Sequence, residues 1–236
     1  SPRDYGPVME VLTAFARQES PVGAAAAATP AAGAPAVPAD VEAVFKVIGR
    51  RTDAQIATEM EEGHGCLDLT RINAVGVDLA DANLQNTCWD GSDLRGAIIS
   101  GANLADTTFN SAILQQANLD GVEAEGASFA SANMFGTNLS RSDLSHANLL
   151  AANMATSLLQ GTNLADANLQ GANLSGATMF GATLTGTNLL NANLANAVLP
   201  DVDLSRAENL TAEQVSAALT NAGTKLPADI DVPPDF

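Results

Sequence analysis

The chain has 236 residues and a formal net charge of −17, from 27 acidic and 10 basic residues. Because nucleic acids and anionic membranes bind clustered Lys and Arg, this charge argues against both as direct partners. Aromatic residues make up only 4% of the chain, which excludes a conventional globular core built on large rings.

Two cysteines, Cys66 and Cys88, are too few for a disulfide framework. They predict reduced thiols in a reducing compartment, and hence a cytoplasmic protein. No run of the sequence approaches the 18 apolar residues that a membrane-spanning helix needs.

The chain is expected to begin with a helix over residues 1–20, with Pro7 at its first position. The apolar side of this helix consists of Val8, Val11, Leu12 and Phe15. Residues 21–38 are rich in Ala, Pro and Gly, a composition typical of a linker without fixed structure.

Residues 39–66 are predicted to form a helical cap over the N-terminal end of the next segment. The inward side chains of its first helix are Val41, Val44, Phe45 and Ile48, with Gly49 near the stop. Thr52 and Gln55 have the spacing of a capping box that begins a third short helix, ending near Gly63.

A five-residue repeat fills residues 67–206. Its 28 centres run from Leu69 to Leu204 in steps of five without insertion, and 26 of them are Leu, Ile, Met, Phe or Trp. The residue two before each centre is Ala, Ser or Thr in 23 of the 28 units, and all 17 charged residues of this segment fall on the other three positions. Two of every five residues therefore face a dry interior, and three face water.

This period matches neither a helix nor a strand. It fits a short extended stretch followed by a turn, since Gly, Asn, Asp and Ser occupy the outward pair. The two exceptional centres, Ala74 and Ala124, follow the larger Ile72 and Val122, a swap that nearly conserves volume. One such unit cannot bury its apolar side chains alone, so the units must stack as a solenoid.

Units such as "ANLSG" and "SDLRG" resemble the pentapeptide-repeat family, and residues 1–66 resemble the helical N-terminal extension of a bacterial subgroup. The resemblance implies an all-β solenoid, a right-handed quadrilateral β-helix with four pentapeptides in each coil. The 28 units then give about seven coils, roughly 34 Å of rod at the usual strand spacing. Short α-helices are expected to cap both ends.

In such a coil, residues 20 apart lie over one another. Trp89, Phe109 and Phe129, the only aromatic centres, are therefore expected to stack inside the rod. Outside it, the geometry predicts an amide ladder. Its members are Asn133, Asn153, Asn173 and Asn193.

Residues 207–236 are predicted to cover the C-terminal end. Thr211 and Gln214 form a capping box for a helix over residues 212–220, and Leu210 and Val215 have the spacing of a hydrophobic staple.

The sequence offers little for chemistry. It has no nucleophile elbow or phosphate-binding loop, and only His64 and Cys66 stand close enough to be considered as metal ligands. We therefore expect no enzyme, cofactor, metal or small-molecule substrate, and we interpret His64 and Cys66 as part of an entrance loop.

The acidic residues of the repeat gather on one side of the predicted rod. A strip of them is a candidate docking surface for a basic protein, and the alternative is a solvated face that only confers solubility. Two outward Phe residues are further candidates for partner contacts. The candidate residues are Asp106, Glu123, Glu125, Asp143, Asp166, Asp203, Phe135 and Phe180.

Two functions fit these features. The first is a non-enzymatic scaffold that docks a protein partner, with dimerisation left open. The second, implied by the resemblance, is a DNA mimic that binds gyrase and confers quinolone resistance. Duplex DNA of the rod's length carries about 20 charges, whereas the repeat has 13 acids and four Arg, a net of −9. The resemblance also implies, for some members of the subgroup, a membrane segment upstream of the first helix.

Overall fold

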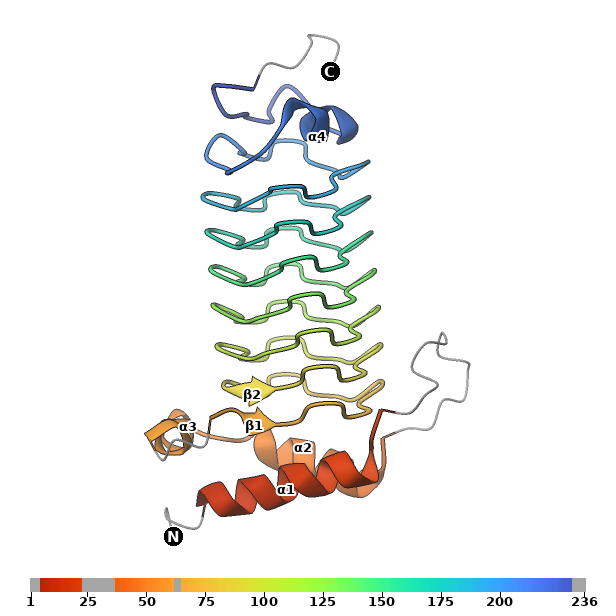
Figure 1. The fold of residues 1–236 in the computed structure, drawn as a ribbon, viewed down its shortest axis with the longest axis vertical. Helices are drawn as coiled ribbons and strands as arrows, with labels where there is room; N and C mark the ends of the chain where they lie inside the picture. Colours follow the sequence, from red (N-terminus) through yellow and green to blue (C-terminus); the bar gives the residue numbers. More distant parts are fainter. Residues whose placement is uncertain (1–4, 23–36, 62–64, 231–236) are drawn as a thin grey trace.

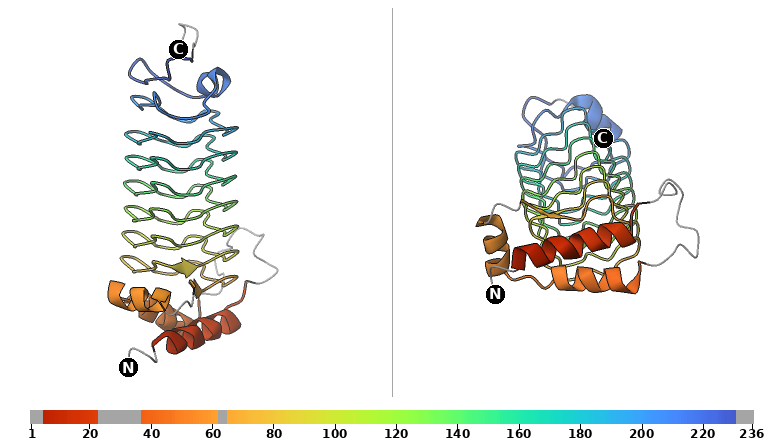
Figure 2. Two further views of the ribbon diagram at one scale, coloured as in Figure 1. Left: turned by 60° about the vertical axis from the view of Figure 1, so that its left-hand side comes forward. Right: turned by 60° about the horizontal axis from the view of Figure 1, so that its bottom comes forward.

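The computed structural model describes residues 5–22, 37–61 and 65–230. The repeat forms a straight four-sided rod with helices at both ends (Figures 1 and 2). α1 (Tyr5–Glu19) and α2 (Ala39–Ile48) lie across the N-terminal end, and α3 (Asp53–Glu61) lies beside it. β1 (Leu67–Asp68) and β2 (Thr87–Cys88) start the rod, and α4 (Ala212–Ala217) lies at its other end. In the part of the chain that is described, no helix is long and apolar enough to cross a membrane.

Parallel pairing joins residues 20 apart along the rod. β1 pairs with β2, Leu67 with Thr87, and the same offset continues to the pairing of Asn188 with Glu208. One coil therefore contains four pentapeptides, as predicted. We number the four faces of the rod by their centres: faces 1, 2, 3 and 4 contain Trp89, Leu94, Ile99 and Leu104, respectively, with the centres 20 residues before and after each.

A left-handed backbone turns each corner. The residue two after each centre has a φ between 54° and 69° from Arg71 to Asp201, whether or not it is glycine. Glycine, asparagine and aspartate adopt this conformation most easily, which explains why they recur at this position. Thr156, with a φ of 57°, is a β-branched exception.

The interior is a column of stacked side chains, as predicted. The Phe109 ring lies 6.3 Å from Trp89 and 5.1 Å from Phe129 between centroids, and the rings are nearly parallel. The predicted amide ladder is also present: Asn153 Nδ2 donates to Asn133 Oδ1 at 3.3 Å, and the bond repeats at Asn173 and Asn193. Both observations confirm that residues 20 apart lie over one another.

The predicted apolar side of α1 does not pack against the rod. Val8, Val11 and Phe15 are exposed, and Leu12 is half-buried. The helix instead buries a side made mainly of small residues. They are Gly6, Met9, Thr13, Ala16 and Ser20. Small side chains let the helix approach the rod closely, so its larger apolar residues remain on the outer side.

The cap satisfies backbone groups at the open edge of the first coil. Pro21 and Val22, expected to belong to the linker, run against this edge, and Val22 N donates to Arg71 O at 2.9 Å. Ser20 O accepts from Asn73 N at 2.6 Å, and Gly49 O accepts from Asn83 N at 2.8 Å. Residues 23–36 of the predicted linker, and His64, lie outside the described residues.

A disulfide joins Cys66 to Cys88, whose Cα atoms are 5.7 Å apart. It ties the start of the first coil to the second. The prediction of two reduced thiols was therefore wrong, because coil stacking brings residues 22 apart within bonding distance. A structural disulfide is typical of oxidising compartments, so it also argues against the cytoplasmic location that was inferred from reduced cysteines.

At the other end, the predicted capping box is present. Gln214 N donates to Thr211 Oγ1 at 3.3 Å, and Thr211 N donates to Gln214 Oε1 at 2.8 Å. α4 ends at Ala217, three residues before the predicted stop at residue 220. The reason is that Leu219 leaves the helix and pairs with Val198, which extends the ladder of face 3.

Candidate interaction surface

Four of the six candidate acids lie together on face 4 and its following corner. Asp106, Glu123, Glu125 and Asp143 come from three consecutive coils, and Glu123 is paired directly with Asp143. Asp106, Glu123 and Glu125 are exposed and form no ion pair within the described part of the chain. We call these four residues the acidic strip.

Asp143 differs from its neighbours because its carboxylate is held in place. Asp143 Oδ1 accepts from Ser145 Oγ at 2.7 Å, Ser145 N at 2.9 Å and Asn163 Nδ2 at 2.9 Å. Partial burial opposes ionisation of this carboxyl, but the hydrogen bonds outweigh it and hold the pKa below its ordinary value. Asp143 therefore remains charged although Glu123 lies beside it.

The other two candidate acids lie farther along the rod. Asp166 is exposed one coil beyond Asp143. Asp203 is two coils farther and is already partnered, since Lys225 Nζ donates to Asp203 Oδ2 at 2.9 Å. Hydrogen bonds from Ser205 and Lys225 hold the pKa of Asp203 far below the usual range. The C-terminal segment thus neutralises the end of the acidic side.

The two candidate aromatic residues do not join the acidic strip. Phe135 is 41% exposed and follows a centre of face 2, whereas Phe180 is 47% exposed and follows a centre of face 3. A single partner docked flat on the acidic strip would therefore not contact Phe135. Phe180 is closer, because it lies in a turn between faces 3 and 4.

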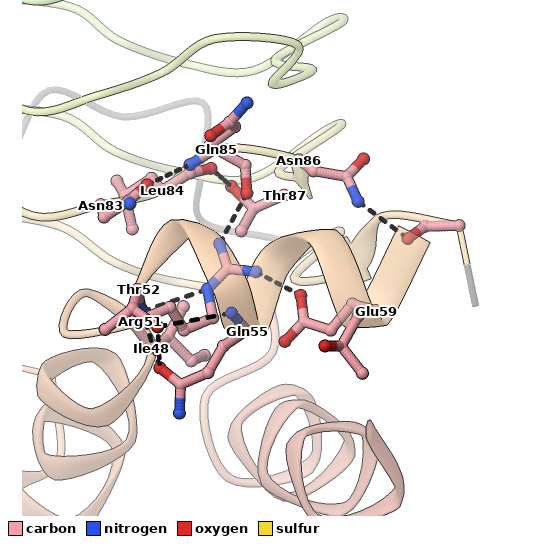
Figure 3. Close-up of polar contacts among 12 residues, drawn as sticks. Ile48, Arg51, Thr52, Gln55, Glu59, Asn83, Leu84, Gln85, Asn86 and Thr87 are labelled. Atoms are coloured by element: carbon pink, nitrogen blue, oxygen red, sulfur yellow. Dashed lines mark hydrogen bonds and ion pairs between the residues drawn. The ribbon is translucent and has the colours of Figure 1, made fainter. Parts of the chain in front are cut away.

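A buried ion pair in the cap escaped the sequence analysis. Arg51 Nη1 donates to Glu59 Oε2 at 2.7 Å, Arg51 Nη2 donates to Gln85 O at 2.6 Å, and Arg51 Nε donates to Ile48 O at 3.2 Å. Figure 3 shows the guanidinium directed from the cap toward Glu59 and the main chain at Gln85. Nothing distinguishes Arg51 from the exposed Arg50 beside it in sequence, so no local signal could have identified its role.

A groove of about 450 Å³ separates α1 from α3 and β1. Its charged lining residues are Glu10, Arg17, Glu59 and Asp68. Arg17 forms an ion pair with Asp68, and Glu59 is bound to Arg51. No group of three or more His, Cys, Asp or Glu side chains that could hold a metal occurs among the described residues. Three of the four charged side chains of the groove, Arg17, Asp68 and Glu59, are therefore engaged in ion pairs.

A sequence model of pentapeptide repeats matches eight copies in overlapping segments between residues 78 and 208, more than half of the chain. The chain belongs to the pentapeptide-repeat family. This membership agrees with the four-sided coil, in which residues 20 apart pair in parallel as in a quadrilateral β-helix. The family is one of structural repeats, and the comparisons indicate no catalytic family.

Solved structures of the same family are similar to this chain. QnrB1, a plasmid-mediated fluoroquinolone resistance protein, is 23% identical over 68% of this chain and 83% of its own, with a TM-score of 0.35. HetL, from the cyanobacterium Nostoc sp. strain PCC 7120, is 23% identical over 77% of this chain and 93% of its own, with a TM-score of 0.28. A thylakoid-lumen protein of Arabidopsis thaliana is 34% identical over 46% of this chain and 68% of its own, with a TM-score of 0.22. A search of curated proteins found no match.

Proposed function

We propose that this chain is a non-enzymatic interaction scaffold whose acidic strip docks a basic protein. The observation that carries the proposal is the grouping of Asp106, Glu123 and Glu125, exposed and without ion pairs among the described residues, beside the ionised Asp143. Carboxylates held on a rigid, flat surface attract a basic partner and fix its orientation. We expect neither nucleic acids nor small molecules to bind this surface.

The proposal includes a rod of about seven coils that is covered by helices at both ends. A covered rod keeps its strand edges from pairing with other chains, so binding is confined to its faces. The docking proposal does not depend on the cellular compartment, although the Cys66–Cys88 disulfide favours an oxidising compartment.

Reversal of charge tests the acidic strip. The triple variant Asp106→Lys/Glu123→Lys/Glu125→Lys leaves the hydrogen-bonded Asp143 in place. We expect it to lose the proteins that the unaltered chain captures from extract of its host. The matched control, Glu19→Lys/Asp78→Lys/Asp81→Lys, changes the same number of exposed acids elsewhere and should retain them. Equal capture by both variants, with unchanged melting temperatures, would refute the docking role.

A gyrase-binding DNA mimic is the competing proposal. DNA mimicry needs charge on all sides, whereas the acidic strip occupies one side, and Arg141 and Lys225 neutralise Asp120 and Asp203. A supercoiling assay distinguishes the two, since a mimic inhibits gyrase or protects it from a quinolone. The scaffold proposal predicts neither effect.

A further inference from the structure

Charge is distributed unevenly along the rod. Between Arg141 and Asp201 the only charged residues are Asp143 and Asp166, and both belong to face 4. The other three faces of this part are uncharged. Most of the exposed large apolar side chains outside the cap lie in this part or just beyond it. They are Leu150, Leu158, Phe180, Leu190 and Leu219.

Face 3 gathers several of them into one surface. Leu158, Thr178, Val198 and Leu219 are paired in succession, so their side chains form a column on neighbouring coils. Asparagine occupies the same column lower down, at Asn118 and Asn138. Leu158 is 41% exposed and Leu219 is 55% exposed. Phe180 and Pro200 lie in the adjoining turns. We call Leu158, Phe180, Val198, Pro200 and Leu219 the apolar patch.

Opposite charges lie on the corner beside the apolar patch. Arg141 and Asp201 occupy the same corner of the rod, and only Gly161 and Gly181 lie between them in this column. Both charged residues are exposed. Arg141 Nε also donates to Asp120 Oδ1 at 3.1 Å, and Asp201 Oδ1 accepts from Asn221 Nδ2 at 3.1 Å. Along this corner, a positive charge at Arg141 is therefore followed by two glycines without side chains and then by a negative charge at Asp201.

We propose that this face binds a second copy of the chain, with the two rods antiparallel. The two-fold axis lies in the contact plane, perpendicular to the rods, midway between the levels of Gly161 and Gly181. Each column of one copy then faces the same column of the second copy, running in the opposite direction. This axis places Arg141 opposite Asp201 of the second copy, and Asp201 opposite its Arg141. An isologous contact needs this kind of self-complementarity.

The same arrangement places Phe180 and Leu158 near the centre of the contact and the two ion pairs at its edge. Phe180 lies opposite Gln160 of the second copy, beside its Leu158, whereas Val198 lies opposite Asn138 of the second copy. Charge also restricts where two copies can meet. Two chains of net charge −17 repel one another, and the uncharged part of the rod is where they approach with the least repulsion. Face 4 and the acidic strip are left largely uncovered, so this inference is independent of the proposed function.

Sedimentation velocity of the full chain, up to about 100 μM, tests the proposal. We expect a reversible dimer. Phe180→Lys should weaken it about tenfold or more, as expected for a central interface side chain. Leu190→Lys is the matched control, because Leu190 has similar exposure on face 1, and it should leave the dimer intact.

A charge exchange tests the antiparallel arrangement. Arg141→Asp and Asp201→Arg should each weaken the dimer, and the double variant should restore it, since each new charge again meets its opposite across the two-fold axis. A chain that remains monomeric throughout this range overturns the proposal. A dimer that survives Phe180→Lys but is lost in Val11→Lys, on the exposed side of α1, also overturns it. Failure of the double variant to restore the dimer rejects the antiparallel geometry.

Discussion

The ring of Phe45 lies 5.5 Å from that of Trp89, between centroids, at an angle of 42°. Phe45 belongs to α2, so the cap continues the aromatic column of the rod by one more ring. Both side chains are fully buried. The cap and the rod therefore share one hydrophobic core.

Phe45→Ala should remove this continuity. We expect a loss of about 3–5 kcal/mol, because a large buried ring leaves a cavity that its neighbours fill only in part. Urea unfolding measures the loss, and hydrogen exchange should show faster exchange at Asn73 and Asn83, whose amides the cap covers. Val47→Ala on the exposed side of α2 is the control, with an expected change within about 0.5 kcal/mol.

Arg51→Met should destabilise the cap by about 3–5 kcal/mol, because it leaves Glu59 charged in a buried site. The double variant Arg51→Met/Glu59→Leu should recover part of this loss, since neither ion then remains. Thermal unfolding measures both. A double variant no more stable than the single one would show that the hydrogen bonds to Ile48 and Gln85 matter more than the ion pair.

Thr156→Asn should stabilise the rod. A left-handed backbone costs a non-glycine residue about 1–2 kcal/mol, and asparagine tolerates it better than threonine. We expect a gain of about 0.5–1 kcal/mol in urea unfolding. Thr185→Asn, at a turn position without positive φ, should show no gain. Equal gains in both variants would show that the effect comes from replacing threonine by asparagine in general, and not from the left-handed backbone at residue 156.

Asp143 should make the stability of the folded chain depend on pH in the acidic range. Its folded-state pKa lies below the ordinary value of 3.8, so its contribution is present above that pH and is lost as the pH falls through the folded pKa. Asp143→Asn should therefore flatten the fall of melting temperature below about pH 4.

Removal of the disulfide, by Cys66→Ser/Cys88→Ser, should lower stability by about 3 kcal/mol, because the unfolded chain regains the entropy of an open loop. A reductant should lower the melting temperature of the unaltered chain and leave that of the double variant unchanged. If the reductant affects neither, the cysteines are not joined in solution.

Much of this fold follows from the sequence because the inward positions are so restrictive. A charge at a centre such as Leu144 would be buried without a partner, so the period of five is visible in every unit. The 20-residue coil then determined the aromatic stack and the amide ladder. The same rule placed Asp106, Glu123, Glu125 and Asp143 on one side of the rod.

The cap was harder to predict. The apolar stripe of α1 resembles a buried face, yet the helix packs through Thr13 and Ala16, and which side packs is decided by the shape of the rod end. The partners of Arg51 are likewise a matter of tertiary contact. The disulfide had a usable signal: in a chain where residues 20 apart are neighbours, cysteines 22 apart are close.

The uniform 20-residue offset has a consequence for how such a rod can change over generations. Gain or loss of one whole coil alters its reach and leaves every surface in line. Gain of a single pentapeptide instead rotates all later residues by a quarter turn, so that Asp143 would leave the side that Glu123 occupies. Lengthening by whole coils is therefore compatible with a retained partner, and lengthening by single units is not.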